Sequence, residues 1–402
     1  MNKETYSLSL ETLTIFRNLL NDPILSRLNV FFQIDDKNTK ECVSKYCDFV
    51  SELYKVDTNL SDYIYQLVMN DENVVVSTIG KKKSLSLPLQ QALDYELEVI
   101  EQISNITSEQ IIKGLDIYGF LPQWENTSYD YKKEYQTRLD QIGKKGYGIY
   151  AKHRAFCIKK HQVVPILNPD PQRLSDLVGY QEERNKVIKN TLAFLQGLDS
   201  HNVLLYGDAG TGKSSTIKAI VNEYYDQGLR LIEVKKHQLH QIPNLMDQLA
   251  DNPLHFILFI DDLSFESNDD NFIALKTILE GGIQHAANNI AVYATTNRRH
   301  FVKENMEQRA GNEVFRNDVI QETISLASRF GLTVTFQKPK KDLYNEIVLE
   351  LAKRRNLQLD EKELLIRAHA YAIRCTGFSP RTAKQFIELE KINEVMEGNQ
   401  DV

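Results

Sequence analysis

The feature that most constrains the fold is a glycine-rich segment at residues 207–214, which reads GDAGTGKS. It follows an apolar run at residues 203–206 that is typical of a short buried strand, and it leads into residues 215–225, whose apolar spacing is typical of a helix. In this order, glycines let successive backbone N–H groups face a phosphate, and the helix N-terminus adds partial positive charge. We therefore predict a phosphate-binding loop, with a glycine-rich turn between strand and helix as the alternative.

Two side chains of this segment have predicted roles of their own. Lys213 is expected to reach the outer phosphates of a nucleotide, and the Ser214 hydroxyl is expected to hold Mg²⁺. The residues expected to contact the bound phosphates are Gly207, Asp208, Ala209, Gly210, Thr211, Gly212, Lys213, Ser214 and Ser215.

Length and composition bound the remaining possibilities. A chain of 402 residues is too long for one ordinary core, so two or three domains are expected. With 42% hydrophobic and 26% charged residues, the composition is that of a soluble globular protein. The formal net charge of -7 argues against a protein that coats nucleic acid nonspecifically.

The cysteines and the N-terminus indicate the compartment. Four scattered cysteines are too few for a disulfide framework, and they show no metal-ligand spacing. The N-terminus lacks a basic region followed by an apolar one, and no apolar run is long enough to span a bilayer. We predict a cytoplasmic protein with no membrane partner.

Residues 1–150 carry the apolar spacing of several helices and no recognisable chemistry, which predicts a mostly helical N-terminal domain. The last part of this region, residues 118–150, is rich in tyrosine and lysine. Interleaved aromatic and basic side chains can bind single-stranded nucleic acid. The favoured interpretation is that these aromatic residues pack a loop-rich domain edge.

A change of pattern marks a domain boundary at residues 151–175, where closely spaced prolines indicate an extended connector. Beyond it, residues 176–338 alternate between strand-like and helix-like segments. This alternation predicts an α/β core in which helices cover both faces of a parallel sheet. Residues 339–402 have the spacing of helices and are expected to form a small helical lid.

Polar side chains follow the predicted strands, at the edge where parallel sheets bind ligands. Asp261 and Asp262 follow the apolar run at residues 256–260, and Asn297 follows residues 290–295. We expect Asp261 to hold Mg²⁺ and Asp262 to orient an attacking water, because phosphoryl transfer depends on positioning and charge stabilisation. The Asn297 amide is expected to contact the γ-phosphate and the same water. The alternatives are a helix cap for the acids and an ordinary turn for Asn297.

Five motifs in this order resemble Walker A, Walker B, sensor 1, the arginine-finger box and sensor 2 of AAA+ ATPases. The first three are the phosphate loop, the strand that ends in two aspartates and the strand that ends in Thr-Thr-Asn. The other two are SRFG at residues 328–331 and GFSPR at residues 377–381. The resemblance covers about residues 176–389, and it implies an AAA+ P-loop core that binds ATP with Mg²⁺ and hydrolyses ATP.

The same resemblance implies roles for residues outside the loop. The segment LVGY at residues 177–180 occupies the place where the superfamily cradles adenine, which assigns Val178 and Gly179 to the nucleotide. Arg381, at the start of a predicted helix, is expected to reach the phosphates from the lid. Arg329 is expected to project into the ATP site of a neighbouring subunit, which requires a homo-oligomer. The arginines that compete for this role are Arg298, Arg299, Arg309 and Arg316.

More narrowly, three segments resemble an uncharacterised bacterial AAA+ family known only as ATP-binding proteins with a domain of unknown function. They read DDLSFE at residues 261–266, LEGG at residues 279–282 and ATTNRRH at residues 294–300. This resemblance implies the fold and the ATP chemistry, and it supplies no substrate.

The second acid departs from the superfamily pattern, in which it is usually glutamate. Asp262 is one methylene shorter, so either it acts through a shifted water or Glu266 supplies the carboxylate. Slow hydrolysis would follow, and it would suit a switch better than a fast motor.

Three functions remain open at this level. The leading hypothesis is an oligomeric AAA+ ATPase that remodels a protein or nucleoprotein partner, with the N-terminal domain as adaptor. The second is a nucleotide-gated DNA loader or initiator-like switch, and the third is a slow-turnover interaction protein that nucleotide stabilises. ATP turnover separates the third hypothesis from the others, and salt-dependent DNA binding separates the second from the first.

Overall fold

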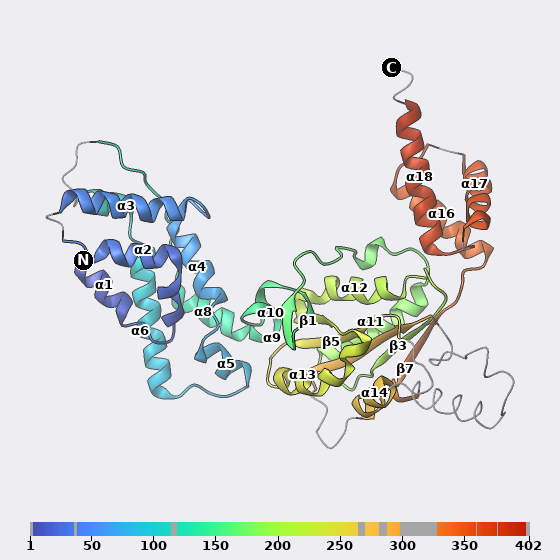
Figure 1. The fold of residues 1–402 in the computed structure, drawn as a ribbon, viewed down its shortest axis with the longest axis horizontal. Helices are drawn as coiled ribbons and strands as arrows, with labels where there is room; N and C mark the ends of the chain where they lie inside the picture. The colour runs from blue at the N-terminus through green and yellow to red at the C-terminus, as the bar shows by residue number, and fades with distance from the viewer. Residues whose placement is uncertain are drawn as a thin grey trace. The chain divides into compact units, whose positions relative to one another are not determined.

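Two units with separate cores make up the chain, Met1–Lys152 and His153–Val402 (Figure 1). The computed structural model describes residues 3–35, 38–113, 119–263, 270–280, 288–297, 328–358, 360–375 and 377–398. Within these ranges, no helix combines the length and the apolar character that a bilayer span requires.

The first unit is helical, as the apolar spacing of residues 1–150 predicts. Its elements include the 3₁₀ helix η1 (Arg17–Asn21). The α-helices are α1 (Lys3–Glu11), α2 (Pro23–Phe32), α3 (Thr39–Leu53), α4 (Leu60–Asn70), α5 (Val74–Gly80), α6 (Leu87–Ser104), α7 (Ser108–Ile112), α8 (Tyr131–Asp140), α9 (Ile142–Lys145) and α10 (Ile149–Lys152). The start of α2 shows how the sequence sets these boundaries. The Asp22 carboxylate accepts from the N–H groups of Ile24 and Leu25, and Pro23 takes the first helical position.

Three aromatic residues of the tyrosine- and lysine-rich segment lie inside this unit. Trp124, Tyr131 and Tyr135 are buried in its hydrophobic core. The Trp124 indole N–H donates to the Ile106 carbonyl oxygen at 3.0 Å. These rings pack inside the domain, as the favoured interpretation states, but they lie in its core and not at a loop-rich edge, with Tyr131 and Tyr135 on α8. They are not available for stacking on nucleic acid.

A buried carboxylate holds the turn that precedes η1. Glu96 of α6 is 2% exposed. Its carboxylate accepts hydrogen bonds from the backbone N–H groups of Thr14, Ile15 and Phe16 and from the Thr14 hydroxyl, at 2.5–3.0 Å. Because two of these residues are themselves buried, their N–H groups depend on the carboxylate as an acceptor.

We expect Glu96→Ala to destabilise the first unit by about 3 kcal/mol, because it leaves buried backbone N–H groups without an acceptor. Glu98→Ala on the same helix is the control, since the Glu98 side chain is 57% exposed and its ion pair with Lys132 lies at the surface. Urea unfolding followed by tryptophan fluorescence measures the difference, because the single tryptophan, Trp124, lies in this unit. Equal unfolding midpoints for the two variants would contradict the role given to Glu96.

In the second unit, the described residues form a seven-stranded sheet in the order β2-β1-β4-β5-β6-β3-β7. The strands are β1 (Ala155–Lys159), β2 (Gln162–Pro165), β3 (Val203–Gly207), β4 (Leu229–Glu233), β5 (His255–Ile260), β6 (Ile290–Thr296) and β7 (Leu332–Phe336). Every neighbouring pair is parallel except β1 with β2. Because β6 lies between β3 and β5, the carboxyl ends of these three strands meet at one edge.

The hairpin β1–β2 lies within residues 151–175, where the sequence predicts only an extended connector. β1 pairs in parallel with β4, so this part of the segment extends the sheet. Lys160 and His161 form the hairpin turn, with φ values of 48° and 62°. Two successive residues with positive φ match the twist of the flanking strands in a two-residue hairpin. The predicted parallel sheet therefore carries one antiparallel edge strand.

Helices cover both faces of the sheet, as predicted. On one face, α11 (Gln181–Leu195) and α12 (Lys213–Tyr224) share a hydrophobic core with alternate residues of the strands. Figure 1 shows α13 (Ile242–Leu249) and α14 (Asp270–Glu280) on the opposite side from α12. Short 3₁₀ helices are η2 (Leu174–Asp176), η3 (Tyr225–Gln227) and η4 (Lys236–Gln241).

Three helices form the predicted lid: α16 (Lys341–Arg354), α17 (Glu361–Arg374) and α18 (Pro380–Gly398). The Ser379 hydroxyl accepts from the Thr382 N–H at 3.1 Å and caps α18, while Pro380 takes the first helical position. The predicted fold class is thereby confirmed: an α/β core with a helical lid and a separate helical N-terminal unit.

Candidate functional site

The predicted phosphate loop lies at the carboxyl end of β3 and leads into α12. Gly207 has a φ of 142°, and a Cβ atom there would lie 2.0 Å from the Phe336 carbonyl oxygen of β7. Gly212, directly before the first helical residue, has a φ of 92°. A side chain is sterically excluded at the first position and strained at the second, so both glycines are required by the backbone path of the loop.

Lys213 is held within the loop and is 6% exposed. Its ammonium donates to the carbonyl oxygens of Gly207 and Asp208, each at 2.7 Å, and to Asn297 Oδ1 at 2.9 Å. Burial lowers the pKa of Lys213, while neighbouring carboxylates act in the opposite direction. The ammonium is therefore positioned by the loop and connected to the end of β6.

Asp261 and Ser214 place oxygen atoms side by side at this edge. The Ser214 hydroxyl donates to Asp261 Oδ1 at 2.6 Å, and the Thr295 hydroxyl donates to the same oxygen at 2.5 Å. Among the described residues, no group of three or more His, Cys, Asp or Glu side chains is arranged to hold a metal ion. Mg²⁺ needs no such group, because it commonly takes one or two carboxylates and completes its shell with water and substrate phosphates. The serine and aspartate oxygens fit this ion.

Asp262 has an uncommon left-handed backbone conformation, with a φ of 53°. Its N–H donates to Thr295 Oγ1 at 2.9 Å, and its Oδ1 accepts from Asn297 Nδ2 at 2.7 Å. Asn297 thus contacts Asp262 through its amide nitrogen and Lys213 through its amide oxygen. Residues predicted from three separate segments form one hydrogen-bonded series.

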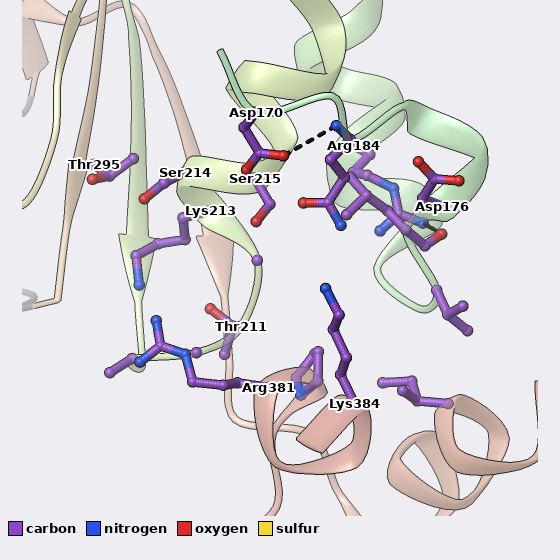
Figure 2. A pocket seen from close by; sticks show the side chains of 18 of the residues that line it. Asp170, Asp176, Arg184, Thr211, Lys213, Ser214, Ser215, Thr295, Arg381 and Lys384 are labelled. Atoms are coloured by element: carbon purple, nitrogen blue, oxygen red, sulfur yellow. Dashed lines mark hydrogen bonds between the residues drawn. The ribbon is translucent and has the colours of Figure 1, made fainter. Parts of the chain in front are cut away.

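A cavity of 530 Å³ lies at this edge of the sheet, within the range of about 300–1,000 Å³ that is usual for small-molecule pockets. Figure 2 shows Lys213, Ser214 and Thr295 on one side of it. The predicted site residues that line the cavity are Val178, Ala209, Gly210, Thr211, Gly212, Lys213, Ser214, Ser215, Asp261, Asp262, Asn297 and Arg381.

The lid forms one wall of the cavity. The Arg381 backbone N–H, at the start of α18, donates to the Gly210 carbonyl oxygen at 3.2 Å. Lys384 also lines the cavity, and Figure 2 shows its side chain extending from α18 toward the hollow. Lys384 was not predicted, although its spacing of three residues from Arg381 places both on one side of the helix.

Apolar residues of α16 also line the cavity. Ile347 and Leu351 do so together with Leu177 and Val178. The sequence pattern assigns Ile347 and Leu351 to the lid core, because their helical spacing fits packing between helices equally well. The further lining residues without a predicted role are Asp170, Gln172, Asp176, Arg184, Thr295 and Pro380.

The remaining predicted site residues lie elsewhere. The Asp208 carboxylate accepts from the Lys338 backbone N–H at 2.9 Å, between the core and the lid. Gly179 packs against α16 of the lid. Arg329 lies three residues before the start of β7, is half-buried and is not among the residues that line the cavity. Glu266 lies outside the described residues, as do the arginines that compete with Arg329.

The connector after β2 is attached to two elements around this cavity. Asn222 of α12 donates to the carbonyl oxygens of Asp170 and Gln172, at 2.8 and 2.7 Å. Arg354 of α16 donates to the Ser175 carbonyl oxygen at 2.6 Å. The connector therefore bridges the helix that follows the phosphate loop and the first helix of the lid.

Three features define the AAA+ P-loop class of nucleotide-binding proteins. They are a phosphate loop at the end of a parallel strand, acids at the end of the strand two places away in the sheet, and a helical lid on the same cavity. A family model described as "Protein of unknown function (DUF815)" matches residues 151–392, which is more than half of the chain. The chain belongs to this family.

Individual proteins match smaller parts of the chain. Replication factor C subunit 4 from Homo sapiens is 38% identical over 76 residues, which are 19% of this chain and 20% of that protein. The RuvB Holliday junction branch migration motor from Thermotoga maritima has a TM-score of 0.36 at 18% identity, covering 54% of this chain and 63% of its own. AMPPCP-bound DnaA from Aquifex aeolicus has a TM-score of 0.40 at 18% identity, covering 56% and 67%. The chain thus spans a fifth of the human protein and less than two thirds of RuvB.

Proposed function

We propose that the chain binds ATP with Mg²⁺ and hydrolyses it, as a subunit of an oligomeric AAA+ ATPase that remodels a protein or nucleoprotein partner. The observation that carries this proposal is the hydrogen-bonded series from Lys213 through Asn297 to Asp262. All three residues line one cavity. The series joins a phosphate-binding cation to a carboxylate that can orient water, and phosphoryl transfer depends on that combination.

ATP binding rests on the loop and on Lys213. The N-terminal N–H groups of α12 and the Lys213 ammonium attract negative charge. In the structure this ammonium donates to two neutral carbonyl oxygens. A phosphate oxygen would accept a stronger, charge-assisted hydrogen bond from it. Mg²⁺ held by Ser214 and Asp261 would neutralise charge on the phosphates.

Asp262 is the residue we propose to orient the attacking water. Its carboxylate lines the cavity, and the bond from Asn297 Nδ2 to Oδ1 fixes the direction of that carboxylate. The second carboxylate oxygen is then the proposed acceptor for the water. Glu266 remains the alternative.

The lid and the N-terminal unit are the proposed output of the ATP cycle. The start of α18 already contacts the loop at Gly210, so a phosphate that attracts Arg381 would change the same contact. The first unit has its own core and is the proposed adaptor for a cytoplasmic partner. DNA loading is not carried further, because Trp124, Tyr131 and Tyr135 are buried.

Asp262→Asn is expected to keep ATP binding and to lower kcat by about 100-fold or more, because an amide is a poor substitute for a carboxylate that orients water. Asp261→Ala is expected to weaken Mg²⁺-dependent binding instead. Asp247→Asn, an exposed position on α13, is the control for the loss of one negative charge. ATP hydrolysis and the binding of a fluorescent ATP analogue measure the two effects.

Each alternative has a distinct outcome in the same measurements. Wild-type kcat in Asp262→Asn, together with loss of hydrolysis in Glu266→Gln, would transfer the role to Glu266. A wild-type chain that binds ATP without turnover would favour the interaction-protein hypothesis. A pull-down with Asp262→Asn, which is expected to retain ATP, identifies the partner.

A further inference from the structure

We propose that Thr295 is a positioning residue that sets the geometry of both acids, a role that rests on the ATPase function proposed above. Thr295 lies near the end of β6, between β5 and β3, and it pairs with Leu205 of β3. It is 2% exposed and lines the cavity. Its buried hydroxyl is therefore held on a rigid central strand beside the two aspartates.

Thr295 makes hydrogen bonds to three consecutive residues after β5. Its hydroxyl donates to Asp261 Oδ1 at 2.5 Å and accepts from the Asp262 N–H at 2.9 Å. Its carbonyl oxygen accepts from the Leu263 N–H at 2.7 Å. A hydroxyl has one proton and two lone pairs, so it can make the first two bonds at the same time. One side chain thus fixes a carboxylate and a backbone group of adjacent residues.

The Thr295 hydroxyl orients the Asp261 carboxylate through a hydrogen bond that does not involve Ser214. Both hydroxyls donate to Asp261 Oδ1 in the structure. Ser214 is also the proposed Mg²⁺ ligand, and an oxygen that binds a cation reorients its proton away from that cation. Thr295 is not part of the proposed metal shell, so its bond to Asp261 can persist when Mg²⁺ binds. The carboxylate is then held in place before the ion arrives.

For Asp262, the same hydroxyl stabilises an uncommon backbone conformation. A φ of 53° is disfavoured for a residue with a side chain, and it persists where surrounding bonds hold it. The bonds from the N–H groups of Asp262 and Leu263 to Thr295 do this. Valine has no acceptor in its side chain, so Thr295→Val should let Asp262 leave this conformation. Its carboxylate would then move away from Asn297 Nδ2, which it contacts at 2.7 Å.

The test uses the full chain with Thr295→Val, which removes the hydroxyl at nearly constant volume, and Thr295→Ser, which keeps it. Thr191→Val is the matched control, because Thr191 is also buried and its hydroxyl bonds the Val187 carbonyl oxygen and the Tyr293 hydroxyl. Three quantities are measured for each variant. They are the affinity for fluorescent ATP without Mg²⁺, the Mg²⁺ concentration that gives half of the Mg²⁺-dependent gain in affinity, and kcat.

Thr295→Val is expected to leave Mg²⁺-free affinity within about twofold, to raise the Mg²⁺ requirement about tenfold and to lower kcat about tenfold or more, as expected for loss of a hydrogen bond to a charged group. Thr295→Ser is expected to restore both values, and Thr191→Val is expected to change neither. A wild-type Mg²⁺ requirement and kcat in Thr295→Val would overturn the role of Thr295 while the proposed ATPase function stands. Equal impairment in Thr295→Ser and Thr295→Val would assign the effect to packing and also overturn it. A wild-type chain without Mg²⁺-dependent nucleotide binding would overturn both proposals.

Discussion

Lys213→Ala is expected to lower ATP affinity about 100-fold or more while the full chain stays folded. The ammonium would lose charge-assisted hydrogen bonds to phosphate, each of which contributes about 1.5–3 kcal/mol. In the structure its partners are the carbonyl oxygens of Gly207 and Asp208 and Asn297 Oδ1. Lys213 and Asn297 line the cavity, so water can replace the ammonium after truncation.

Binding of a fluorescent ATP analogue measures the expected loss of affinity. Thermal unfolding without nucleotide shows whether the chain stays folded. Lys186→Ala is the control, because Lys186 is an exposed residue of α11 and its removal changes the net charge equally. Unchanged ATP affinity in Lys213→Ala would contradict the assignment of the phosphate loop to the ATP site.

Arg329→Ala is expected to bind ATP nearly normally and to lower kcat about 10³-fold, which is the low end for arginine fingers. Arg329 lies three residues before the start of β7 and does not line the cavity of its own chain, which supports a role in the site of an adjacent subunit. A planar, permanently charged guanidinium can bond a phosphate through two N–H groups, so Arg329→Lys is expected to restore little activity.

Mixing variants tests whether the site is shared between subunits. An Arg329→Ala subunit keeps its ATP site, and a Lys213→Ala subunit keeps its arginine, so a mixture is expected to recover part of the ATPase activity. The control mixes Arg329→Ala with the double variant Lys213→Ala/Arg329→Ala, which offers no intact arginine. Equal ATPase activity in both mixtures would show that Arg329 has a structural role and not a catalytic one. The same conclusion would follow if the specific activity of the wild-type chain stayed constant on dilution below the assembly threshold.

The sequence predicts the parts of this site that depend on local pattern. A glycine-rich loop between a strand and a helix has few other backbone solutions, and Gly207 shows the steric reason. The acids and Asn297 were expected to meet because each ends a parallel strand. Their meeting in one hydrogen-bonded series with Lys213 follows from β6 lying between β3 and β5.

The parts that were not predicted depend on contacts between distant segments. The role of Thr295 requires the register of β6 against β5, and that of Glu96 requires α6 to pack on a turn about 80 residues earlier. The hairpin at residues 155–165 was missed because its strands are short and nearby prolines indicate a connector. Lys384 was missed because a lysine on a lid helix is usually solvated.

The attachment of the connector has a mechanical consequence. Asn222 holds the connector on α12, the helix whose first residue is Lys213, and Arg354 holds it on α16. Ser175 is three positions after Gln172 in the sequence, so the two residues can lie at most about 10 Å apart when the chain is fully extended. This short length limits how far α12 and α16 can move apart before one of the hydrogen bonds from Asn222 or Arg354 breaks. Because β1 and β2 fix the chain to the sheet before it reaches the connector, the connector carries force between the lid and α12. A movement of α16 away from the core therefore pulls, through this short segment, on the helix whose first residue is Lys213.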